Sequence, residues 1–491
     1  MRRATRRTIR TWIVVIPALL AAGLMTGLAR EGFAAELRVG ATTISITPDR
    51  PVPLSGQMTT RIARNVETPV TATALALESR DGDQVIDQAI LVSCELVAIR
   101  EGIIEQVREH LADRLPDFDP MKLVLSATHT HTAPVMAEDR YELPDDDTIV
   151  SPTEYVAFLV DRIVEASTEA WESRQPAGVG WGLGHAVVAQ NRRSVYADGR
   201  SVMYGRTNQD DFVGIEGYED HGVEVLFFWD KDESLIATAI NVACPAQEVE
   251  SRSAVNADFW HSVRQQLRER HGENLAILGW IGAAGDQSPH LMIRKDAEER
   301  MRRLRGLDRL DEIARRIVHA WDEAYEGARQ EIVTDLPLVH TVKTIELPVR
   351  LVTDEEVAEA TREVESLSAD PAQKRRMLWH QAVLDRYEQQ QSGSVPPYEM
   401  ELHVIRVGDV AIATNPFELF TEYGIRMKAR SPSLQTFVIQ LAGPGSYLPT
   451  AFAVQGGGYS AIVQSSKVGP KGGDELVERT VEAIKALWPE D

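Results

Sequence analysis

The chain has 491 residues, with 52 Lys and Arg against 74 Asp and Glu, which gives a formal net charge of −22. Nucleic acid is excluded as the main partner, because such binding needs a basic surface and no basic stripe follows the first ten residues. With 43% hydrophobic and 26% charged residues, the composition is that of an ordinary globular protein and not of a disordered or fibrous one.

The first 35 residues are predicted to be an export signal that is removed from the mature protein. An uncharged apolar run over residues 12–29 follows five arginines and ends near small residues suited to cleavage. Thr5-Arg6-Arg7 is similar to a twin-arginine signal, which would export a folded protein to the periplasm or the medium. An uncleaved anchor is the rival interpretation, although the run is at the lower edge of what spans a bilayer. The acidic charge otherwise predicts peripheral membrane contact at most.

From residue 36 to residue 491 the alternation of strands and helices, with no Ser/Gly- or Pro-rich linker, predicts one large domain. The fold class is α/β, with mixed β-sheets flanked by helices. Hairpins are predicted from 70–78 with 85–97, 223–229 with 235–243, and 402–407 with 410–414. Helices are predicted over 102–115, from a capping box at 151–154 onward, and over 259–271, 297–327 and 474–488.

Residues 353–391 form a charged, helix-prone insertion within this domain. Its charge pattern predicts a solvated pair of helices. A lid over an active site is the functional alternative, and no residue of the insertion supports it directly.

The strongest local signal is a pair of histidines one residue apart. An apolar strand over 122–127 leads into His129-Thr-His131. In an extended chain residues i and i+2 point to the same side, so both imidazoles can face one site. This spacing suits a metal, although two polar residues at a strand end are an equally ordinary feature.

A second signal is a buried strand over 275–281 that runs into a glycine-rich turn. The turn lets backbone N–H groups approach a substrate and presents Asp286 and Ser288 at the strand end. The same residues are also good turn formers, so alone the motif is weak.

Together these segments resemble the neutral/alkaline, non-lysosomal ceramidase family, and they come in the order that the family has. The resemblance spans roughly residues 37–460. Its motifs are Val39-Gly-Ala-Thr-Thr-Ile-Ser-Ile-Thr-Pro48, Ser126-Ala-Thr-His-Thr-His-Thr-Ala-Pro134, Asn191-Arg192, Gly285-Asp-Gln-Ser-Pro289, Asn415-Pro-Phe-Glu418, Tyr447-Leu-Pro-Thr450 and Gly457-Gly-Tyr459.

The resemblance implies a zinc amidase that cleaves the amide between a fatty acid and a sphingoid base, so the expected cofactor is Zn²⁺ and the expected partner is a small-molecule or lipid amide. By motif, the implied metal ligands are His129, Glu418 and Tyr447, with Cys244 at the apparent position of a further ligand. The implied catalytic residues are Ser288, His131, Arg192, Tyr459 and Asp286.

These roles are chemically coherent. Zinc keeps an open position in catalytic sites, Arg192 and Tyr459 would donate to a developing oxyanion, and His131 would move protons. Ser288 could attack the amide itself or orient a zinc-bound water, and the sequence leaves both mechanisms open. Arg193 adjoins Arg192, and Glu422 is the rival of Glu418 as the carboxylate ligand.

Two features depart from the family. Cys244 stands where the family has a zinc-binding histidine, and it could be a ligand, a buried apolar thiol or half of a disulfide with Cys94. The immunoglobulin-like domain that follows the family's catalytic domain is also expected to be absent.

The leading prediction is therefore an exported, zinc-dependent hydrolase of an N-acyl amide. One alternative keeps the metal but changes the bond, to an ester or a glycan-linked amide, because a fold does not determine a substrate. Another alternative is a non-catalytic binding protein on a ceramidase-like scaffold.

Overall fold

Two β-sheets packed face to face form the centre of the structure, a computed structural model that describes residues 35–393 and 395–488. The larger sheet is an antiparallel run of strands with one parallel strand added at each edge, β14 beside β13 and β6 beside β5. Its strands in spatial order are β14 (Ala276–Ile281), β13 (Leu235–Val242), β12 (Gly222–Asp230), β7 (Gln175–His185), β1 (Glu36–Ser45), β4 (Thr71–Asp81), β5 (Gln84–Cys94) and β6 (Leu123–Ala127).

The smaller sheet has four strands and is also mixed, since β18 and β20 run parallel while the other pairs are antiparallel. A buried apolar layer lies between the two sheets. The strands are β16 (Leu338–Leu347), β17 (Tyr398–Val407), β18 (Val410–Thr414) and β20 (Gln435–Ile439).

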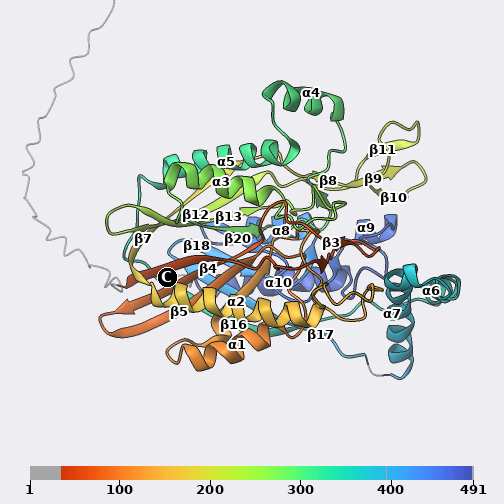
Figure 1. The fold of residues 1–491 in the computed structure, drawn as a ribbon, viewed down its shortest axis with the longest axis horizontal. Coiled ribbons are helices and arrows are strands. Elements are labelled where there is room, and N and C mark those ends of the chain that lie inside the picture. The colour runs from red at the N-terminus through yellow and green to blue at the C-terminus, as the bar shows by residue number, and fades with distance from the viewer. Residues whose placement is uncertain (1–34, 394, 489–491) are drawn as a thin grey trace, which may run out of the picture. The chain divides into compact units, whose positions relative to one another are not determined.

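Helices cover the outer face of each sheet, so the order of layers is helix, sheet, sheet, helix (Figure 1). On the larger sheet lie α1 (Ile103–Arg114), α2 (Pro152–Glu172), α3 (Phe259–His271) and α5 (Arg309–Ala328). On the smaller sheet lie α8 (Thr421–Arg430) and α10 (Pro470–Lys485). The predicted α/β class with mixed sheets is confirmed.

The three predicted hairpins are confirmed as β4–β5, β12–β13 and β17–β18. Gly82 and Gly408 take a positive φ at two of the turns, where glycine carries no Cβ to clash. The helix predicted over 259–271 is also confirmed, and Ser151 Oγ caps α2 by accepting the Glu154 N–H at 3.1 Å.

The single helix predicted over 297–327 is wrong. The chain forms α4 (Lys295–Arg305), breaks at Gly306 with φ 69°, and restarts as α5 after Asp308 caps it. A left-handed glycine ends a helix because it turns the last carbonyls away from the helix axis. The last helix begins at Pro470, four residues before its predicted start, because proline is well suited to the first helical turn.

The insertion at 353–391 is a helical pair, as predicted. It contains α6 (Asp354–Leu367) and α7 (Lys374–Gln391). These two helices pack against each other and lie at the right-hand side of the view in Figure 1. Thr353 and Glu356 form a complete capping box at the start of α6.

The predicted leader, apart from Ala35, lies outside the described residues. Among the helices that are described, none combines the length and apolar character that crossing a bilayer requires.

Candidate functional site

The site begins where the parallel strands β5 and β6 end side by side, Cys94 opposite Ala127. His129 follows β6 in a left-handed conformation with φ 66°, a strain of roughly 1 kcal/mol or more that is usually found at functional positions. Its Nδ1 lies 2.6 Å from the carbonyl oxygen of Val97 in the segment after β5. A carbonyl only accepts, so Nδ1 carries a proton and Nε2 is the ring nitrogen that is directed at the site.

His131 faces His129, with 3.2 Å between the two Nε2 atoms. Its Nδ1 lies 3.0 Å from a carboxylate oxygen of Glu250. Burial lowers the pKa of His131 and the neighbouring His129 adds to this, while Glu250 opposes both. Gly56 leaves room for the ring, because a Cβ there would lie 2.5 Å from His131 Cγ.

Glu418 and Tyr447 are held opposite each other by the short parallel pair β19 (Glu418–Leu419) and β21 (Tyr447–Leu448). Glu418 Oε2 lies 3.4 Å from His129 Nε2. Burial alone would raise the pKa of Glu418, but His129, the Tyr447 hydroxyl and Arg192 outweigh it and hold the pKa at about 2. Burial, then the Glu418 charge, raise the pKa of Tyr447. Glu418 is therefore an ionised carboxylate beside a neutral phenol.

Gly285 of the glycine-rich turn packs directly against the backbone of β19, which carries Glu418. Its N–H donates to the carbonyl of Leu419 at 2.7 Å, and a Cβ on Gly285 would lie 2.3 Å from the carbonyl oxygen of Glu418. The two segments approach this closely only because the residue is glycine.

Arg192 joins the turn to Tyr447. Its guanidinium donates to the carbonyl of Gly285 at 2.9 Å and to the Tyr447 hydroxyl at 3.0 Å. Its neighbour Arg193 points elsewhere and forms two hydrogen bonds to the buried carboxylate of Glu216. Of the two adjacent arginines, Arg192 is thus the one in contact with the site.

Tyr459 completes this side of the site. Its ring lies 5.8 Å from that of Tyr447 and 5.5 Å from that of Trp379 on α7, centroid to centroid. Burial, then the Glu418 charge, raise the pKa of its phenol to about 12. The contact with Trp379 places the helical insertion beside the site.

Ser288 is fully buried in β15 (Gln287–Ser288), which pairs with β8 (Gln190–Asn191). Its Oγ lies 3.0 Å from the Tyr204 hydroxyl and 3.3 Å from Gln247 Nε2, and accepts the His290 backbone N–H at 3.1 Å. Within the described residues no hydrogen bond joins Ser288 to His131.

Asp286 has a different setting from Ser288. Its carboxylate accepts from the Thr421 N–H and hydroxyl at 2.8 and 2.7 Å and from Asn191 Nδ2 at 2.9 Å. Burial raises its pKa. These hydrogen bonds connect the glycine-rich turn to α8 and β8. Asp286 therefore helps to hold the turn in place.

Cys244 is buried in an apolar cluster and its Sγ contacts the carbonyl oxygens of Val188 and Pro245 at 3.8 Å. Burial, followed by the charge of Asp258, raises the pKa of the thiol. Both Cys244 and Cys94 are free thiols, so the disulfide alternative is not realised. In the described part of the chain, no hydrogen bond joins the Cys244 thiol to His129 or Glu418.

Three site residues escaped the sequence analysis: Glu250, Tyr204 and Gln247. Gln247 and Glu250 follow Cys244 within six residues, but they share no motif with the histidines. Tyr204 takes φ 56°, a conformation invisible in the sequence. Only the folded chain brings them to His131 and Ser288.

His129 and Glu418 are donors that zinc accepts, and the distance between them suits two ligands of one ion. Among residues 35–393 and 395–488, no three His, Cys, Asp and Glu side chains converge on a finished metal site. His129 Nε2 and Glu418 Oε2 are nevertheless 3.4 Å apart, close to the edge of about 3.3 Å of a tetrahedron with zinc–ligand bonds near 2.0 Å. Tyr447 beside Glu418 supplies an additional oxygen.

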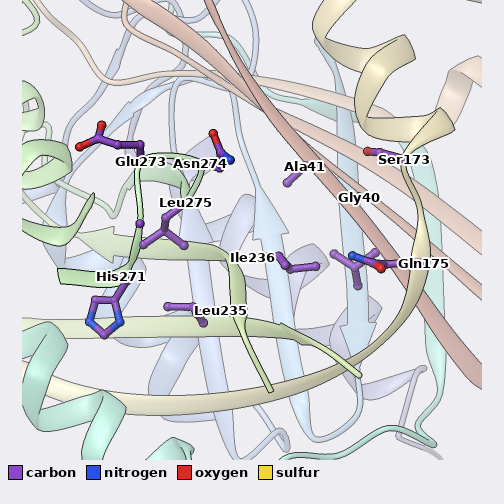
Figure 2. Close-up of a pocket in the computed structure, with 12 residues that line it drawn as sticks. Gly40, Ala41, Ser173, Gln175, Leu235, Ile236, His271, Glu273, Asn274 and Leu275 are labelled. Atoms are coloured by element: carbon purple, nitrogen blue, oxygen red, sulfur yellow. The ribbon is translucent and has the colours of Figure 1, made fainter. Parts of the chain in front are cut away.

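A separate hollow of about 370 Å³ lies at the opposite end of the central strands, near the starts of β13 and β14 (Figure 2). Ser173, Gln175, His271 and Asn274 are among its lining residues. None of the side chains predicted to carry chemistry lines it. The residues around His129, and not this hollow, therefore form the candidate functional site.

Comparison with known proteins identifies the fold. No protein-family profile and no curated protein matches the sequence. The crystal structure of neutral ceramidase from Pseudomonas aeruginosa is similar with a TM-score of 0.66 at 18% identity, over 92% of this chain and 74% of that one. A structure of ceramidase complexed with C2 gives 0.64 at 16% identity, over 92% and 75%. The ceramidase-like fold predicted from the motifs is confirmed, and at these identities the likeness establishes the fold alone.

Proposed function

We propose that this chain is a zinc-dependent hydrolase of N-acyl amides with a fatty acyl group. The observation that carries the proposal is the convergence of His129, His131, Glu418, Tyr447 and Arg192 through direct contacts on a ceramidase-like fold. Four separate segments of the chain supply these five side chains, and packing alone does not require such a polar set to be buried together.

The metal would be held by His129, Glu418 and Tyr447. His129 would offer Nε2, the ring nitrogen that does not contact Val97, while Glu418 offers an ionised carboxylate and Tyr447 an adjacent hydroxyl. When bound, zinc supplies a Lewis acid that polarises a carbonyl and acidifies water. Cys244 is left out of this set, because its thiol is protonated and surrounded by apolar side chains and carbonyl oxygens.

His131 is proposed to carry protons. Glu250 at its Nδ1 fixes the tautomer, so that Nε2 is free to take a proton from the attacking group and return it to the leaving amine. His131 and Glu250 would thus correspond to the general base and the carboxylate that orients it in other hydrolases.

Arg192 and Tyr459 are proposed to stabilise the oxyanion. The guanidinium of Arg192 is fixed by Gly285 and Tyr447, and the pKa of about 12 keeps the Tyr459 phenol protonated as a donor. Fixed donors of this kind stabilise the transition state without reorganising during the reaction.

Ser288 is proposed either to attack the amide or to orient an attacking water, with Tyr204 and Gln247 as the side chains that orient its hydroxyl. Asp286 is proposed as a positioning residue that holds the Ser288 turn through Thr421 and Asn191.

Amide hydrolysis would be tested on the zinc-loaded full chain with N-dodecanoyl amides of several amines, N-acyl sphingosine among them. Release of dodecanoic acid that is lost after chelation and in H129Q, but retained in H185Q, supports the proposal; His185 is exposed and its imidazole lies 3.9 Å from Glu323, which is not a site residue. Zinc-loaded protein that cleaves no amide would refute it and favour the binding-protein alternative. We also propose that the protein is exported. N-terminal sequencing of the protein from the periplasm tests whether the first 35 residues are removed.

A further inference from the structure

Three arginines border the candidate site from three different segments. Arg100 lies in the segment after β5 whose Val97 carbonyl holds His129. Arg140 lies between β6 and α2, and Arg375 lies in the first turn of α7. All three side chains are half-buried.

The contacts of α7 direct Arg375 toward the site. Arg375 and Trp379 are four residues apart, so they share one face of the helix. Trp379 on that face packs against Tyr459 in a tilted arrangement, with 5.5 Å between ring centroids. Arg375 therefore faces the side of the molecule that holds Tyr459.

Further contacts bring the segment of Arg140 to the same place. Lys374 Nζ lies 3.9 Å from Asp139 and 3.6 Å from Glu142, one on each side of Arg140. The Tyr141 hydroxyl donates to the carbonyl of Gln57 at 2.8 Å, next to the Gly56 that accommodates His131.

The positive charges of these arginines act on one another, and the ionised Glu418 offsets that of Arg100 only in part. Burial lowers the pKa of Arg140 to about 9, with Arg100 and Arg375 as the next causes, and burial followed by Arg375 lowers the pKa of Arg100. Among the described residues, none of the three side chains has an ion pair or a side-chain hydrogen bond. In contrast, the buried Arg193 and Arg264 are paired with Glu216 and Glu95.

Such a cluster is unusual in a chain of net charge −22, where carboxylates are abundant. Half-buried like charges are costly unless an anion compensates them. The guanidinium fork fits a carboxylate, sulfonate or phosphate, to which it donates paired charge-assisted hydrogen bonds.

We propose that Arg100, Arg140 and Arg375 bind an anionic group of the substrate, so that the amide cleaved at the adjacent site belongs to an acidic N-acyl compound. This inference rests on the proposed hydrolysis and narrows its substrate class from N-acyl amides in general to those with an anionic group. The helical insertion then has a role in specificity, because it supplies Arg375 and the Trp379 contact that places it.

The test compares two substrates that differ in charge but little in shape, N-dodecanoylglycine and N-dodecanoylethanolamine, with the zinc-loaded full chain. We expect kcat/KM to favour the glycine compound, and R375Q and R140Q to raise its KM by about tenfold or more while changing the ethanolamine compound less than twofold. R376Q is the matched control, because Arg376 is exposed on α7 and pairs with Glu363 at 3.6 Å. N-dodecanoyl-O-phosphoethanolamine shows whether phosphate is preferred to carboxylate.

An equal loss on both substrates in R375Q, or a parent enzyme that prefers the neutral amide, would overturn the inference. If the parent cleaves neither compound, the proposed hydrolysis fails. The anion site is then tested separately, by measuring the binding of N-dodecanoylglycine with calorimetry. Binding that is lost in R375Q and kept in R376Q supports the anion site, and absent binding to the parent overturns it.

Discussion

The Nε2 atoms of His129 and His131 lie 3.2 Å apart, while each Nδ1 faces an oxygen acceptor, from Val97 in one case and Glu250 in the other. With both protons on Nδ1, two lone pairs face each other, which is unfavourable unless a cation is between or beside them. A metal ion on His129 would relieve this contact, whereas burial and the neighbouring His129 lower the pKa of His131 and disfavour an added proton there.

The zinc content of single variants should distinguish the metal ligands from the residues that only lie near the metal. We expect about one zinc per chain in the parent, a loss of at least about tenfold in affinity for H129Q and E418Q, and retention in C244S. H131Q should keep the metal and lose about 100-fold or more in kcat, because it removes a proton carrier and no ligand. Elemental analysis beside kinetics checks this. Loss of zinc in C244S would make Cys244 a ligand and contradict the proposed set.

Gly56→Ala should destabilise the fold and displace His131. A Cβ would lie 2.5 Å from the ring, at a residue whose φ is 99°. We expect a loss of about 2 to 4 kcal/mol in the free energy of unfolding, measured by urea denaturation. Gly82→Ala is the control, because Gly82 has φ 58° and nothing within 4 Å of the added Cβ; about 1 kcal/mol is expected there. Equal losses in the two variants would mean that contact with His131 contributes nothing.

Lysine substitutions should distinguish the adjacent arginines. Arg193 is buried and its fork binds Glu216 twice, which lysine cannot reproduce, so R193K should lower the melting temperature clearly. R192K should lower kcat by about 100-fold through loss of a fixed donor, with a smaller change in melting temperature. Calorimetry and steady-state kinetics on both variants measure this contrast, and the reverse pattern would exchange the roles of the two residues.

Acid stability should depend on Glu401. Burial alone would raise its pKa, but hydrogen bonds from His403 and Arg108 outweigh this and lower the pKa to about 2. A folded pKa below the unfolded value of about 4.3 stabilises the protein above that value, and the stabilisation is lost as the pH falls from about 4 to 2.

We therefore expect E401Q to cost about 1 to 2 kcal/mol at pH 7, with a difference from the parent that shrinks toward pH 2, measured by urea unfolding at both pH values. E399Q is the control, since Glu399 is exposed on the same strand. A cost for E401Q that does not change with pH would contradict the ionised pair with Arg108.

Local patterns in the sequence determined the hairpins, most helices and the motifs that meet at the site, because alternation, caps and turn residues act over a few neighbours. The break at Gly306 was missed because a left-handed residue inside an apolar helical pattern has no separate sequence signal. The motif order also indicated the ceramidase-like fold and assigned His129, Glu418, Tyr447 and Arg192 to one site.

Tertiary structure alone decided the surroundings of those residues. It turned Arg192 and not Arg193 toward Tyr447, enclosed Cys244 among apolar side chains, and brought Glu250 to His131 from 119 positions further along the chain. These contacts depend on how separate segments pack, which no periodicity or spacing encodes. The same packing brought the start of α7, which carries Arg375, to the segment of Arg140 and to Tyr459, and the anion site that we propose there depends on it.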